Sequence, residues 1–102
     1  MKRYLVTPDA EHDLDVIKAY LLDQGGTRLV RHVLGRVQRG MEFLGDMPGA
    51  GHLREDLTDD KVKFWQVLSY LIVYDPSPRP VHILRVLRSS RDVAALLAGS
   101  RR

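Results

Sequence analysis

The spacing of apolar residues in the first half of the chain predicts two helices. Thr7 and Pro8 are suited to begin the first helix, as its N-cap and first residue. Acidic residues in its first turns, among them Asp13, complement the positive end of the helix. One helical face is then marked by apolar residues three or four positions apart: Ala10, Leu14, Ile17 and Leu21.

A second helix follows after Gly25 and Gly26, which end the first. Thr27 can cap it, and its apolar stripe lies within residues 30–44. Because about two residues remain for the connection, the two helices must form an antiparallel hairpin.

The second half of the chain has the composition of β-strands. Residues 62–68 (VKFWQVL) and 70–75 (YLIVYD) nearly adjoin, which predicts a tight antiparallel hairpin. Residues 76–80 (PSPRP) break the chain, and residues 81–88 (VHILRVLR) read as the next strand. A polar loop spans residues 48–61, and a short helix over residues 93–99 can be capped by Ser89, Ser90 or Asp92.

With a weak strand candidate at residues 2–7, these elements predict an α+β fold in the order β-α-α-β-β-β-α. We expect a small antiparallel sheet with the N-terminal helical hairpin packed on it. A chain of 102 residues forms one domain, for which we expect residues 1–98, and residues 99–102 are expected to be a frayed basic tail.

The composition of the chain excludes several kinds of site and several classes of protein. The chain has no cysteine, which excludes disulfides and thiolate zinc sites, and its four histidines are too scattered to form a metal site. We expect neither a metal nor another cofactor. There is no apolar run long enough to span a membrane and no apolar segment typical of a signal peptide, so a cytoplasmic protein without membrane contacts is expected.

Charge is distributed unevenly along the chain. Residues 1–60 carry a net charge of −3 and residues 61–102 a net charge of +6. Such a basic half indicates an anionic partner, although it can also be a solvated surface. Strand alternation places Lys63, Trp65 and Val67 on one face, where a cation beside an aromatic ring could stack on bases or bind a partner helix. Alternatively, Trp65 belongs to the core and Lys63 is a solvated charge.

Three segments resemble the ParE/RelE superfamily of bacterial toxins from type II toxin–antitoxin pairs: MPGAGHLREDL (residues 47–57), WQVLSYLIVYD (65–75) and ILRVLRSSRDVAALL (83–97). The resemblance covers nearly the whole chain. It implies a compact sheet carrying a helical hairpin, and a cognate antitoxin protein as partner.

Members of this superfamily differ in their targets. RelE-like members cleave mRNA in the ribosome, and ParE-like members poison DNA gyrase. In the RelE-like nucleases an arginine follows the aromatic residue of the middle strand, whereas here Leu71 follows Tyr70. Arg88 stands where many relatives have histidine, and the terminal helix lacks a tyrosine or histidine. These departures favour a ParE-like gyrase inhibitor that needs no catalytic residue. The alternatives are a nuclease using Lys61, Lys63, Arg85 and Arg88, and a non-toxic protein that still binds the antitoxin.

The resemblance and the charge pattern together suggest two sets of contacts. For the target we expect Arg54, Lys61, Lys63, Trp65, Arg85 and Arg88, and we expect the fold to tolerate the loss of the exposed charges of Arg85 and Arg88. Arg91 could instead form a local ion pair with Asp92. For the antitoxin, which we expect to lay an amphipathic helix across the hairpin, the candidates are Val16, Ile17, Tyr20 and Leu21. We do not expect the protein alone to bind DNA directly.

Overall fold

The computed structural model describes residues 3–58, 61–90 and 93–100. Its elements follow one another as β1 (Tyr4–Val6), α1 (Pro8–Asp46), β2 (Lys63–Val67), β3 (Tyr70–Asp75), β4 (Val81–Arg88) and α2 (Val93–Ser100). The predicted α+β class and order of elements are therefore confirmed. Gly99 and Ser100, expected in a frayed tail, belong to α2, while Arg101 and Arg102 lie outside the described residues.

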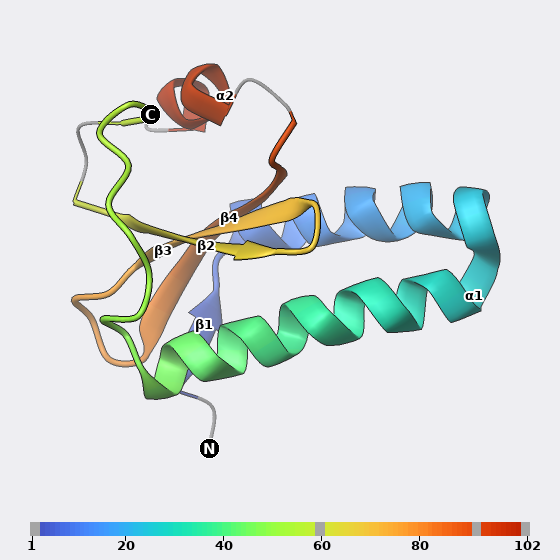
Figure 1. Cartoon of the computed structure of the whole chain (residues 1–102), viewed down its shortest axis with the longest axis horizontal. Helices are drawn as coiled ribbons and strands as arrows, with labels where there is room; N and C mark the ends of the chain where they lie inside the picture. The colour runs from blue at the N-terminus through green and yellow to red at the C-terminus, as the bar shows by residue number, and fades with distance from the viewer. Residues whose placement is uncertain (1–2, 59–60, 91–92, 101–102) are drawn as a thin grey trace.

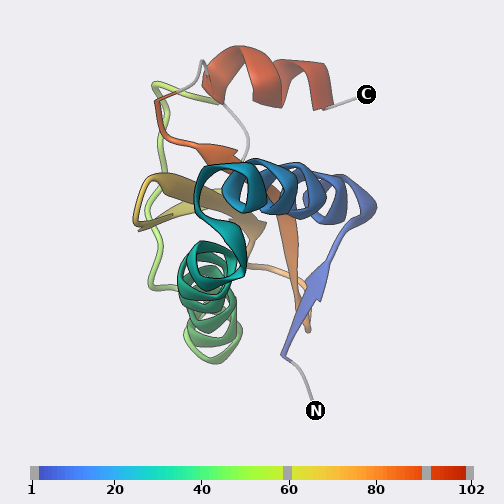
Figure 2. The same ribbon diagram turned by 90° about the vertical axis from the view of Figure 1, so that its right-hand side faces the viewer.

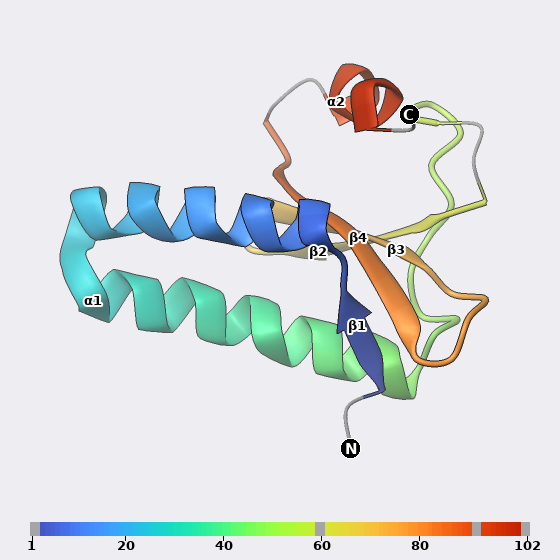
Figure 3. The same cartoon turned by 180° about the vertical axis from the view of Figure 1, so that it is seen from behind.

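The helical hairpin is a single element, α1, that reverses direction at Gly26. This glycine has φ 71° and ψ −165°, a backbone conformation that side-chain-bearing residues rarely adopt. Figures 1 and 3 show the two halves of α1, residues 8–25 and 27–46, running antiparallel beside each other. We refer to them as the first and second halves of α1. The hydroxyl of Thr7 accepts a hydrogen bond from the amide of Ala10 at 3.3 Å, which confirms the predicted N-cap.

The sheet has four strands in the order β1-β4-β3-β2. β2, β3 and β4 form the expected antiparallel meander. β1, however, pairs parallel to β4, from Tyr4 opposite Val81 to Val6 opposite Ile83, so the sheet is mixed rather than wholly antiparallel. Two reversals along the meander give β4 the direction of β2, and β2 runs in the same direction as β1.

Both faces of the sheet are covered, by different helices. The main core lies between α1 and one face, where Val37, Leu44, Ile72 and Ile83 are fully buried. Figure 2, which looks along the two halves of α1, shows them next to each other against the sheet. A smaller core on the opposite face joins the sheet to α2, through Phe64, Leu71, Val73, Leu87, Val93 and Leu97. The predicted alternation of β2 is confirmed, because Trp65 and Val67 face α1 while Phe64 faces α2.

Two glycines allow close approaches that place the elements around the sheet. A Cβ atom on Gly40 would lie 2.9 Å from Cγ2 of Val67, so this glycine lets the second half of α1 approach β2. Gly51 lies against Tyr74, whose hydroxyl accepts the Gly51 N–H at 2.9 Å and donates to the carbonyl of Pro48 at 2.7 Å. The start of the long loop is thereby held to β3. In the described part of the chain, no helix is both long and apolar enough to cross a membrane.

Candidate functional site

A groove of about 290 Å³ lies where the first half of α1, the end of β4 and α2 meet. Its lining includes His12, Val16, Tyr20, Arg85, Arg88 and Leu96. It therefore brings together three of the residues expected to bind the antitoxin, Val16, Ile17 and Tyr20, and two of those expected to bind the target, although the two sets are far apart in the sequence.

The four residues expected at the antitoxin site have different environments. Val16 and Tyr20 are 53% and 42% exposed and form one wall of the groove. Ile17 and Leu21 also lie four residues apart, but on the neighbouring side of the helix, where they are buried in the main core. The exposed apolar residues that line this groove are therefore Val16 and Tyr20, whereas Ile17 lines it as a buried residue and Leu21 lies outside the lining.

Arg85 is not the exposed charge that we expected, and that expectation is wrong. Its side chain is only 17% exposed and forms a bidentate ion pair with Asp13, with Nε–Oδ2 at 2.7 Å and Nη2–Oδ1 at 2.9 Å. The carboxylate of Asp13, itself 9% exposed, raises the pKa of the Arg85 guanidinium. Because this pair is buried, replacing Arg85 by an acidic residue would disturb the fold as well as any contact with a target.

Asp13 also satisfies the backbone of β4 where β1 has ended. β1 reaches only as far as Ile83, and the Thr7 hydroxyl then donates to the carbonyl of Ile83 at 2.9 Å. Further along, the carboxylate of Asp13 accepts the N–H of Val86 at 3.0 Å. Since an unpaired edge strand exposes such groups, the first turns of α1 replace β1 along this part of the edge. Asp13, Arg85 and Val86 themselves line the groove.

Arg88 is the cation that remains available in the groove. Its guanidinium carbon lies 5.1 Å from the centre of the Tyr20 ring, in a cation–π contact that links β4 to α1. Within the part of the chain that the structure describes, Arg88 forms no salt bridge with a carboxylate. Burial raises the pKa of Tyr70, which also lines the groove, and the charge of Arg88 acts in the opposite direction. Among the residues that the structure describes, the groove therefore combines apolar walls with one guanidinium that no carboxylate pairs with.

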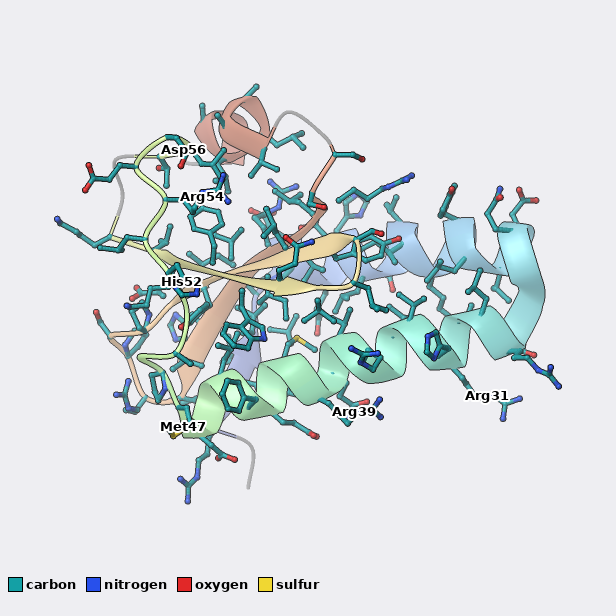
Figure 4. The ribbon with its side chains drawn as sticks, in the orientation of Figure 1. Arg31, Arg39, Met47, His52, Arg54 and Asp56 are labelled. Atoms are coloured by element: carbon teal, nitrogen blue, oxygen red, sulfur yellow. The ribbon has the colours of Figure 1, made fainter. Side chains whose placement is uncertain are left out.

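The other expected target residues lie at the opposite end of the sheet. Arg54 pairs with Asp56 in the loop before β2, with Nη2–Oδ2 at 2.8 Å, and both residues are labelled in Figure 4. This pair raises the pKa of Arg54 and lowers that of Asp56. Lys63 points its ammonium group at the carbonyl of Gly51, 3.4 Å away, and Lys61 is exposed just before β2.

Trp65 is half-buried between two other rings. Its ring centre lies 5.2 Å from that of Phe43 and 6.4 Å from that of His52, which stacks on it. Trp65 also packs against the main core as a partly buried residue, so it is neither a fully buried core residue nor a fully exposed one.

The register of the sheet separates Lys63 from Arg88. Lys63 pairs with Tyr74, whereas Arg88 pairs with Tyr70 at the other end of β3. Two strand spacings and about four residues separate them, which is about 16 Å between Cα atoms. The expected target residues therefore form two groups, Arg85 with Arg88 and Arg54 with Lys61, Lys63 and Trp65. Arg91 and Asp92, expected as an ion pair, lie outside the described residues.

A profile of the family described as "ParE toxin of type II toxin–antitoxin system, parDE" matches residues 4–93. The chain belongs to the ParE toxin family. A search of curated proteins finds no match. The family implies an antitoxin as partner of this ParE toxin. The matched range includes every residue named above on the groove except Leu96.

Sequence reasoning missed the role of Asp13 in this ParE toxin, assigning it only to the charge of the helix end. A signal was present, because Asp13 is three residues after Ala10 and four before Ile17, and so lies within the apolar stripe. A carboxylate in such a stripe needs a buried partner. No group of three His, Asp or Glu side chains suited to a metal ion occurs within residues 3–58, 61–90 and 93–100.

Proposed function

We propose that this ParE toxin inhibits DNA gyrase and that its cognate antitoxin neutralises it by occupying the groove. Arg88, expected to contact the target, lines the same groove as Val16 and Tyr20, which were expected to contact the antitoxin. An antitoxin seated there would cover a residue that the toxin uses against gyrase. Neutralisation would then be direct competition for one surface.

The composition of the groove suggests how the antitoxin binds. An amphipathic helix could place its apolar face on Val16 and Tyr20, which are 53% and 42% exposed. A carboxylate of the same helix could pair with Arg88, whose charge is free, whereas Arg85 is already neutralised by Asp13. Apolar burial would supply most of the affinity, and the charge would orient the partner.

The distance between the cations supports inhibition of gyrase rather than cleavage of mRNA. A nuclease would gather the cations that stabilise the developing phosphorane charge around one phosphate. Lys63 and Arg88 instead lie at opposite ends of the sheet, and Arg85 is held by Asp13. Leu71, at the position where RelE-like nucleases have arginine, is buried beneath α2.

Inhibition of gyrase can be tested directly. The purified toxin should inhibit supercoiling of relaxed plasmid by gyrase, and Arg88→Glu should inhibit at least tenfold less at equal concentration. Primer extension on mRNA from cells expressing the toxin should show no new cuts within codons. Prompt cleavage of mRNA with gyrase unaffected would reverse the choice of target.

Antitoxin docking can be tested with a matched pair of variants on the first half of α1. Val16→Asp places a charge in the groove, and Leu22→Asp places the same charge at a residue of similar exposure, 43%, outside the groove lining. By titration calorimetry against the antitoxin encoded beside the toxin, Val16→Asp should weaken binding more than tenfold, and Leu22→Asp less than threefold. Equal affinities of the two variants would move the antitoxin site elsewhere.

A further inference from the structure

The second half of α1 carries a concentrated positive charge that the sum over residues 1–60 conceals. Between residues 24 and 41 the chain has four arginines and no acidic residue, whereas residues 8–25 hold five acidic residues and one lysine. The hairpin is thus acidic along one half and basic along the other. The four arginines are Arg28, Arg31, Arg36 and Arg39.

These arginines are exposed and unpaired. Each is exposed to solvent, and none forms a salt bridge or a side-chain hydrogen bond with another described residue. The arrangement differs from that of Arg54 and Arg85, whose guanidinium groups are neutralised by Asp56 and Asp13. The four arginines, which we call the arginine face, therefore keep their full charge available to a partner.

Helical geometry gathers the four arginines on one face. With 3.6 residues per turn, they and His32 fall within an arc of about 140° and extend over about 17 Å along the axis. The opposite side of the same helix is the buried stripe of Val33, Val37 and Met41. Figure 4 shows Arg31 and Arg39 on the second half of α1, pointing away from the sheet.

We propose that this face binds the phosphate backbone of double-stranded DNA without sequence preference. The arginine face is long enough to reach several phosphates of one strand, which follow one another every 3.4 Å along the axis. The other exposed residues between the arginines, His32 and Gln38, also carry hydrogen-bonding groups suited to phosphate oxygens.

Between Arg28 and Arg39, this face lacks the apolar centre that a protein partner would need. Protein interfaces are built around an apolar centre. The exposed large apolar residues of α1 end at Leu22 and begin again at Phe43, so none lies among the arginines. The composition of the face therefore favours a nucleic-acid backbone over an acidic protein segment.

Binding of DNA by the four arginines is a separate property from gyrase inhibition and does not depend on it. The groove lies on the first half of α1, and the arginine face lies on the second half, so an antitoxin in the groove leaves the arginines free. From the sequence we expected no direct DNA binding by the protein alone. The separation of charge between the two halves of the hairpin is the reason to propose it.

Fluorescence anisotropy with a labelled 20-base-pair duplex tests the proposal without gyrase. Binding should be detectable at 50 mM NaCl, and log Kd should depend on log salt with a slope magnitude of up to about 3.6, at 0.9 for each phosphate neutralised. Arg31→Gln with Arg39→Gln should weaken binding at least tenfold and reduce that magnitude by about 1.8.

A control variant separates the face from net charge alone. Lys18→Gln with Arg79→Gln removes the same two charges from exposed positions outside the face and should change Kd less than threefold. If both double variants weaken binding equally, or if the unaltered protein does not bind at 50 mM NaCl, the proposal fails. Equal affinity for polyglutamate of matched charge would likewise overturn it in favour of an acidic protein. Circular dichroism should confirm that both variants are folded.

Discussion

Asp13→Ala should be among the most destabilising single changes in the hairpin, because it breaks three interactions at once. The carboxylate accepts two hydrogen bonds from Arg85 and one from the N–H of Val86. Alanine leaves a guanidinium that is only 17% exposed without its counter-charge, and it leaves a strand N–H without an acceptor.

The expected cost follows from the burial of the pair. Removing one partner of a buried ion pair costs about 3–5 kcal/mol. Because Asp13 and Arg85 both retain some contact with water, we expect the lower end, about 3 kcal/mol. A domain of this size is stable by roughly 5–15 kcal/mol, so the variant should still fold. With a urea m-value of about 1.5 kcal/mol/M, the unfolding midpoint should fall by about 2 M.

Urea titration followed by circular dichroism measures this shift, and a double variant tests its cause. Asp13→Leu with Arg85→Leu removes both charges and should be more stable than Asp13→Ala, because no unpaired charge remains buried. A midpoint shift below about 0.5 M for Asp13→Ala, or a double variant less stable than the single one, would refute the reasoning.

Two further predictions concern Tyr74 and its surroundings. Gly51→Ala would place a Cβ atom against the Tyr74 hydroxyl and break the buried hydrogen bonds that hold the loop. Each such bond costs about 1–3 kcal/mol when left unmade, so the urea midpoint should fall by about 1 M or more. Gly49→Ala, where a Cβ atom meets nothing within 4 Å, is the control, and equal midpoints of the two variants would contradict the prediction. Burial raises the pKa of both Tyr70 and Tyr74 above the ordinary value of 10.0. Because the unfolded chain releases these protons first, their contribution to stability is complete below pH 10 and is lost as the pH rises through the folded-state values. The urea midpoint should therefore fall between pH 9 and pH 11, and Tyr74→Phe should show a smaller fall; the same pH dependence in both proteins would exclude Tyr74 as a cause.

The elements of this fold were predictable because their signals are local. A helix is marked by contacts between residues three or four apart, as for Ile17 and Leu21, and its start by an N-cap such as Thr7. The reversal at Gly26 needs only a residue that tolerates positive φ. The resemblance to the ParE/RelE superfamily similarly depended on short segments, and the family is confirmed over residues 4–93.

The candidate site was less predictable, because it depends on pairings between distant residues. Nothing near Arg85 in the sequence reveals that Asp13, 72 positions earlier, neutralises it. The parallel pairing of β1 with β4 decides where that edge is left open.

The charges likewise depend partly on local sequence and partly on how distant elements pack. The spacing of Arg28, Arg31, Arg36 and Arg39 is written in the sequence and places them on one side of a helix. Only the packing of that helix decides that this side faces solvent and has no acidic partner among the described residues. For Lys63 and Arg88, strand register alone sets them at opposite ends of the sheet. Periodicity within an element is a property of neighbouring residues, whereas the partner of each charge is decided by how the elements pack together.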